Sequence, residues 1–214
     1  MSTELRTLFH QRLDQIDAAM VRLFAIVTEG ISAATEAVLS GDPRASVSMA
    51  HQDEMVDTLW IEVEDTAQSL LLLQSPVAGD LRFLLSVLRI APELERSADL
   101  AAHIAERGSA PIAAVLSPKM RGLVDRMGGH AVAMWRRLCE GYVERDAMVA
   151  VVLEEVDDEM DRLHHDLVTE LAQGELTPVV LMEMTLVARF YERLGDHAVN
   201  IARRIAYLAG TTPS

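Results

Sequence analysis

The chain has 214 residues and a mass of 23.6 kDa, enough for one or two domains with their own hydrophobic cores. Half of the residues are apolar and only 4% are aromatic, a composition typical of packed helices rather than of sheet. The formal net charge of −14 disfavours nucleic acid and anionic lipid as partners, because both bind concentrated lysine and arginine. We therefore expect an all-α protein with no nucleic-acid partner.

Apolar residues recur at three- and four-residue spacing in six segments, each bounded by proline, glycine or serine. Pro43 and Pro178 suit the first turn of a helix, with Thr177 as N-cap, whereas Pro92 predicts a kink or a short interruption within its segment. The sequence predicts helices over 4–39, 43–74, 76–108, 117–141, 145–173 and 177–209. Short loops favour antiparallel neighbours, so we expect two tandem three-helix bundles, residues 1–109 and 110–214.

The sequence also indicates the compartment. No apolar run approaches the roughly 20 residues of a membrane span. Asp14, Asp17 and Arg22 interrupt the amino-terminal apolar pattern that a signal peptide would need. The single cysteine, Cys139, cannot form an internal disulfide and lies in a helical pattern, as fits a reducing environment. We expect a cytoplasmic protein that is not an integral membrane protein.

The two halves resemble each other in sequence. The segment DEMVDTL at 53–59 aligns with DDEMDRL at 157–163, an offset of 104 positions. The segment ELERSADLAAHIAER at 93–107 aligns with FYERLGDHAVNIARR at 190–204, an offset of 97. An internal duplication explains both alignments, and the difference in offset falls between the two motifs.

The aligned motifs carry acidic pairs, spaced four residues apart, on two helices of each half. A single pair is usually a solvated helix face, but like charges at this spacing cost about 0.2–0.5 kcal/mol without compensation, and the pairs recur in both halves. Bound cations would supply that compensation. The candidate ligands form a first set, Asp53, Asp57, Glu95 and Asp99, and a second set, Asp157, Asp161, Glu192 and Asp196.

Four converging carboxylates suit hard ions such as magnesium, manganese or iron. His103 and Asn200, each four residues after a motif aspartate, are second-tier candidate ligands. A carboxylate-bridged metalloenzyme is an alternative, although the Glu-x-x-His motif of di-iron bundles is missing. A metal-free structural adaptor whose acidic stripes face solvent or a basic partner is another. The sequence has no phosphate-binding glycine loop and no nucleophile elbow, so we expect no catalysis.

Two segments, SPVAGDLR at 75–82 and ERLGDHAVNIA at 192–202, resemble the sequence motifs of the PhoU family. Members of this family regulate phosphate uptake and phosphate signalling. The likeness spans nearly the whole chain and includes the duplication. It implies two three-helix bundles with acidic motifs that hold multinuclear metal clusters in some members. Those motifs fall on Glu95 with Asp99 and on Glu192 with Asp196, and the companion motif falls on the other four carboxylates.

The same resemblance implies a function and partners. It implies a cytosolic negative regulator, not an enzyme, that couples the ATPase of a phosphate ABC transporter to a sensor histidine kinase, and it is compatible with a homodimer. The first repeat departs from the family pattern at Ser97, Ala98 and His103. These departures leave the carboxylates of the first set in place but change their surroundings, so the second set is nearer to the pattern.

Overall fold

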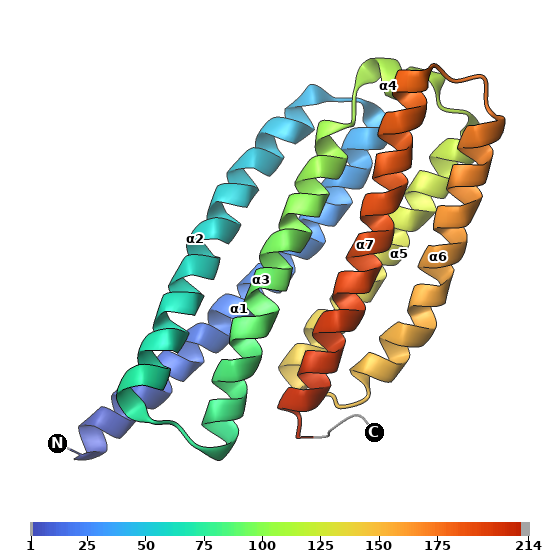
Figure 1. Cartoon of the computed structure of the whole chain (residues 1–214). Coiled ribbons are helices and arrows are strands. Elements are labelled where there is room, and N and C mark those ends of the chain that lie inside the picture. Colours follow the sequence, from blue (N-terminus) through green and yellow to red (C-terminus); the bar gives the residue numbers. More distant parts are fainter. Residues whose placement is uncertain (1, 211–214) are drawn as a thin grey trace.

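The structure is a computed structural model that describes residues 2–210, and the side chains of all of these except 2–5, 43–51 and 53. Within residues 2–210 the regular elements are α-helices, with no strand (Figure 1). They are α1 (Ser2–Ser40), α2 (Pro43–Gln74), α3 (Ala78–Glu106), α4 (Ala110–Val115), α5 (Pro118–Glu144), α6 (Val149–Gln173) and α7 (Pro178–Leu208). The predicted all-α fold is confirmed.

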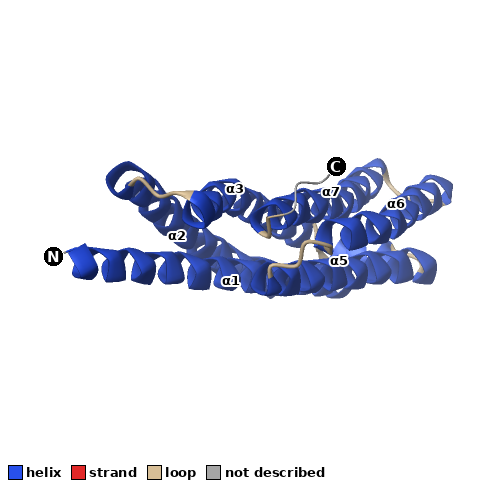
Figure 2. Ribbon diagram, turned by 90° about the horizontal axis from the view of Figure 1, so that it is seen from below, coloured by secondary structure: helices blue, strands red, loops and turns tan. Residues whose placement is uncertain are grey.

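The long helices form two three-helix bundles, α1 to α3 and α5 to α7, which lie side by side (Figure 1). The bundles meet where α1 packs on α5 and α3 packs on α7. Figure 2 shows α1 and α5 along one side of the molecule and α3 and α7 along the other. One continuous hydrophobic core runs through both bundles. Its largest fully buried side chains include Phe24, Trp135, Tyr142 and Tyr191.

The helix bounds follow the prediction closely, with three differences. Of the kink or short interruption predicted at Pro92, the interruption is wrong, because α3 is continuous through this residue, and the kink stays a prediction. The link between the bundles contains a short helix, α4, where we expected a loop. Finally, α6 begins at Val149 rather than at 145, because Arg145 adopts a left-handed conformation (φ 54°) and caps α5.

The predicted start of α7 is confirmed. Thr177 is its N-cap, and the Thr177 side chain accepts a hydrogen bond from the Val180 backbone N–H at 3.4 Å. Pro178 occupies the first helical position, where its missing N–H is not needed. The start of α7 could therefore be predicted from these neighbouring residues alone.

The expectation that no apolar run approaches the length of a membrane span needs correction. By length and composition alone, the segment Arg6–Ser40 of α1 is apolar enough to cross a membrane. Half of its most apolar 18-residue stretch is buried inside the bundles. A core helix of a soluble protein can have the same length and apolar composition. The apolar character of α1 follows from its position, because it packs on α2, α3 and α5 together.

Polar contacts fix the two bundles against each other inside this core. Thr35 of α1 lies with its hydroxyl 2.7 Å from the Tyr191 hydroxyl of α7, and it also donates to the Ile31 carbonyl. Within the second bundle, the Trp135 indole N–H of α5 donates to the Leu194 carbonyl of α7 at 3.2 Å. Gly128 faces Thr35 so closely that a methyl group there would overlap the threonine side chain.

We predict opposite outcomes for two adjacent glycines of α5. Gly128→Ala should lower the free energy of unfolding by about 1–3 kcal/mol, because the new methyl must displace buried Thr35. Gly129→Ala should raise it by about 0.5–1 kcal/mol, because nothing lies within 4 Å and alanine is the better helix former. Urea denaturation measures both. Equal stability of the two variants would contradict the close contact at Gly128.

Candidate metal centre

The second carboxylate set is presented by two helices that pack along each other. Asp157 and Asp161 lie one turn apart on α6, and Glu192 and Asp196 lie one turn apart on α7. On α6, buried Met160 lies beside Asp157 on the side that faces Gly195 of α7, so Asp157 lies at the contact between the two helices. One member of each pair, Asp157 or Glu192, is half-buried, and the other, Asp161 or Asp196, is exposed.

Asp157 is the most perturbed member of this set. Burial raises its pKa to about 6, and the charges of Asp161, Asp196 and Glu192 add to that rise. The carboxylate packs directly on α7, because a methyl group at Gly195 would overlap Asp157 Oδ1. The structure therefore brings all four carboxylates of the second set within mutual electrostatic reach.

Glu192 carries a second sign of an incomplete site. Its side chain is only 16% exposed, and Oε1 accepts an ion-paired hydrogen bond from Arg189. Its other oxygen, Oε2, is buried and has no hydrogen-bond partner among the described residues. Burial and then the charge of Asp196 raise the Glu192 pKa, while Arg189 opposes the rise. A buried carboxylate oxygen without a donor is costly unless a cation satisfies it.

The first set is placed less completely. Asp57 lies exposed on α2, and Glu95 and Asp99 lie half-buried on α3, which packs along α2. The side chain of Asp53 lies outside the described residues. The structure therefore puts the helices of this set side by side, and the convergence of its four carboxylates stays a prediction.

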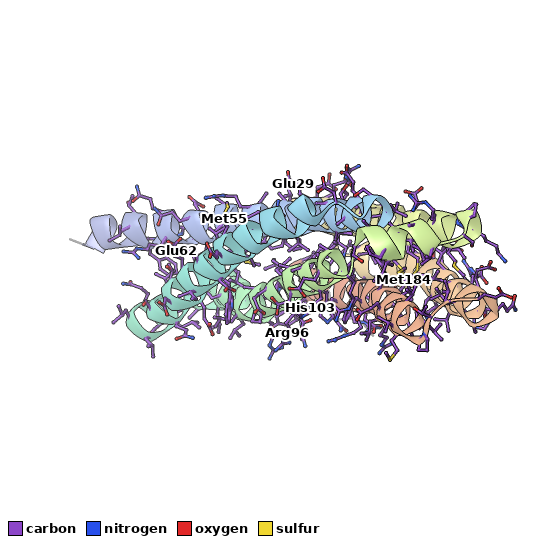
Figure 3. All side chains as sticks on the ribbon, turned by 90° about the horizontal axis from the view of Figure 1, so that it is seen from above. Glu29, Met55, Glu62, Arg96, His103 and Met184 are labelled. Carbon is purple, nitrogen blue, oxygen red and sulfur yellow. The ribbon has the colours of Figure 1, made fainter. Side chains whose placement is uncertain are left out.

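The second-tier candidates differ in their surroundings. His103 is exposed on α3, where its Nδ1 lies 3.1 Å from Glu106 Oε2 and its ring centroid 5.8 Å from that of Phe190. Figure 3 shows His103 and Arg96 on the side of the molecule opposite Glu29 of α1. Asn200 is exposed on α7, one turn beyond Asp196. Their roles as ligands stay predictions.

One polar contact between the bundles could not be predicted from the sequence. His197 of α7 is buried, with its Nδ1 3.0 Å from Ser97 Oγ and 3.7 Å from Glu93 Oε2 of α3. Burial lowers the pKa of His197, and Glu93 opposes that shift. Ser97 was a departure from the family pattern, and its contact with His197 gives it a structural role. In the sequence, this contact is indicated by the position of His197 among apolar residues on its helix face.

The donor atoms of the second set are all carboxylate oxygens. The set offers four carboxylates, one buried oxygen without a partner and a half-buried aspartate with a raised pKa. Oxygen donors of this kind suit magnesium, manganese or iron. As placed, no three His, Cys, Asp or Glu side chains among the described residues are gathered closely enough to hold a metal ion. Metal binding at the second set therefore stays a prediction.

The fold and the paired acidic motifs define a double three-helix bundle built by duplication, and comparison with known proteins identifies its family. The model of the PhoU domain matches residues 20–108 and 124–205. The chain belongs to the PhoU family. The two matched regions fall on the two bundles, as the duplication requires.

Related proteins match along their whole length. Two from Mycobacterium tuberculosis are named phosphate-specific transport system accessory protein PhoU homolog 2 and homolog 1, and each is 34% identical to this chain. The alignments cover 96% of this chain and 98% of homolog 2, and 98% of this chain and 97% of homolog 1. The crystal structure of PhoU from Pseudomonas aeruginosa superposes with a TM-score of 0.87 at 23% identity, over 95% of this chain and 100% of that one. The latter match confirms the fold.

We predict that Asp157 makes the metal-free protein less stable as the pH rises. The folded pKa of about 6 lies above the ordinary 3.8, so the folded state holds the proton more tightly. The free energy of unfolding then falls between about pH 4 and pH 6 and stays lower above that range. Asp157→Asn should be about 1 kcal/mol more stable than wild type at pH 7.5, after allowance for solvent screening, and equal to it at pH 4.

Urea denaturation at both pH values measures this difference. The matched control is Asp166→Asn, an exposed aspartate on the opposite face of α6 that should change neither value. If Asp157→Asn loses stability at pH 7.5, the carboxylate is held by favourable contacts and the repulsion within the second set is disproved.

Proposed function

We propose that this chain is a cytoplasmic phosphate-transport accessory protein that restrains phosphate uptake and phosphate-responsive signalling. It acts as an adaptor between the ATPase of a phosphate ABC transporter and a sensor histidine kinase. The observation that supports this proposal is the end-to-end similarity, at 34% identity, to relatives named as accessory proteins of phosphate-specific transport. Such relatives form a family of transport accessory proteins rather than of enzymes.

The second carboxylate set supplies the chemical part of the proposal. A magnesium, manganese or iron ion would satisfy Glu192 Oε2 and would relieve the carboxylate repulsion that adds to the effect of burial on the pKa of Asp157. Ligands from both α6 and α7 would then tie these helices together. An adaptor gains from this because its surface near the set becomes more rigid and less negative, which changes what it can bind.

We also propose that phosphate status reaches the chain through its partners. Phosphate is repelled by bare carboxylates, so the acidic sets are poor phosphate sites unless a metal ion bridges the two. Tight phosphate binding to the metal-free protein in calorimetry would contradict this part of the proposal.

We predict that tag-free protein holds metal at the second set. Elemental mass spectrometry should find metal in the wild type after growth with iron, manganese and magnesium, and clearly less in Glu192→Ala/Asp196→Ala. The physical reason is the loss of both α7 carboxylates, one of which carries the unpartnered buried oxygen. The matched control is Glu155→Ala/Asp166→Ala, which removes two exposed carboxylates from the opposite face of α6.

The partner part of the proposal is tested with the same proteins. Wild type and the control should capture the transporter ATPase and the kinase cytoplasmic domain, whereas Glu192→Ala/Asp196→Ala should bind them less. Unchanged capture together with lost metal would separate the adaptor role from the metal. Capture of neither partner by the wild type would refute the adaptor role itself.

A further inference from the structure

Apolar side chains gather at the turn between α2 and α3. Leu72, Leu73 and Val77 are 81%, 78% and 74% exposed, the highest values for large apolar side chains among the described residues. We call these three side chains the apolar tip. Figure 1 shows the turn at one end of the first bundle, as is the start of α1, where Leu8 is also exposed. This end of the bundle thus presents an apolar surface to solvent.

The segment that forms the apolar tip has no charge. Residues 66–79 contain no Asp, Glu, Lys, Arg or His, although 24% of the chain is charged. The equivalent turn of the second repeat is polar: residues 174–177 read GELT, with Glu175 exposed and Leu176 half-buried. The fold therefore does not require an apolar turn at this place. An exposed apolar surface without a structural reason indicates a contact site.

The backbone constrains the turn on both sides of Val77. Ser75 and Ala78 have φ of 45° and 50°, in the left-handed region that is costly for residues other than glycine. Between them, the ring of Pro76 fixes its own φ. Leu70, one turn before the tip, is buried and anchors the end of α2 in the core. The apolar tip is therefore a constrained projection on a packed helix pair.

A shallow notch with basic side chains adjoins the apolar tip. It has a volume of about 380 Å³ and lies between α1 and the turn. Arg6 and His10 line it from α1, Asp80 lines it from α3, and Val77 belongs to the tip itself. A phospholipid complements this arrangement, because its phosphate attracts a guanidinium while its acyl chains accommodate apolar side chains.

We propose that the apolar tip inserts into the boundary between the headgroups and the acyl chains of a phospholipid bilayer, with Arg6 facing the lipid phosphates. A fluid surface can close around a projecting turn, whereas the rest of the chain, with its net charge of −14, is repelled by anionic lipid. Contact is thus confined to the uncharged end. Binding is weak and reversible, because the three side chains bury less apolar surface than a myristoyl chain, which alone gives marginal binding.

Flotation of the full chain with phosphatidylcholine vesicles tests the proposal. Wild type should float with the vesicles at millimolar lipid, and Leu72→Ser/Leu73→Ser should bind about tenfold less, because two inserting side chains become polar. The matched control is Val179→Ser/Met182→Ser, which changes side chains that are 61% and 59% exposed at the start of α7, at the opposite end of the molecule (Figure 1). The control should bind like wild type. Neither variant should change the urea midpoint, since all four side chains are exposed.

Lipid composition and salt identify the driving force. Addition of phosphatidylglycerol should lower the binding, because the net charge of −14 is repelled. Salt at about 0.5 M should not lower the binding to phosphatidylcholine, because apolar insertion is not screened. Binding that requires phosphatidylglycerol and is lost in salt would overturn the proposal.

Tryptophan fluorescence gives a second readout. Emission of Val77→Trp should shift to shorter wavelength when phosphatidylcholine vesicles are added, because the indole enters the interface, whereas Val179→Trp should show no shift. Absence of both flotation and shift overturns the proposal. If Leu72→Ser/Leu73→Ser then loses capture of the transporter ATPase, the apolar tip docks a protein and not a lipid surface.

Discussion

The rotation of α7 about its own axis is the constraint on which the arrangement of this molecule depends. Two contacts from the other helices set it: the Thr35 hydroxyl lies 2.7 Å from the Tyr191 hydroxyl, and the Trp135 indole donates to the Leu194 carbonyl. Glu192 follows Tyr191 directly, and Asp196 follows one turn later. Tyr191 is fully buried and contacts α1, and in this orientation the charges of Glu192 and Asp196 act on Asp157 of α6. The core thus decides where the carboxylates point.

The same packing explains why the two halves of a duplicated chain are not equivalent. Ser97 in the first half meets His197 in the second, and Arg189 stands where the first half has Pro92. After a duplication the two halves begin with the same residues. Because α3 and α7 contact each other within one chain, a substitution in α3 need not be matched by the same substitution in α7. The shared acidic motifs persist while the residues around them differ.

Much of this molecule could be predicted from the sequence, because its signals are local. Helical periodicity gave the six long helices, and the proline and N-cap pattern gave the start of α7. Spacing of four residues put each acidic pair on one helix face. The left-handed Arg145, short α4 and the Ser97–His197 contact could not be predicted, because each depends on how the helices are joined or on residues about a hundred positions apart. The pairing of Arg189 with Glu192 was within reach, since it joins residues three apart.

The continuous core has a consequence for what a single repeat could be. The faces through which α1 meets α5 and α3 meets α7 are mostly apolar, and the other half of the chain covers them. A free three-helix repeat would expose these faces to water, at a cost that only association with another repeat could offset. The chain therefore has the architecture of a dimer whose two subunits have been joined by a linker through α4. Because the two repeats are joined in one chain, each first repeat packs against its own second repeat. Each repeat can therefore keep residues that differ from those of the other, which two identical subunits cannot.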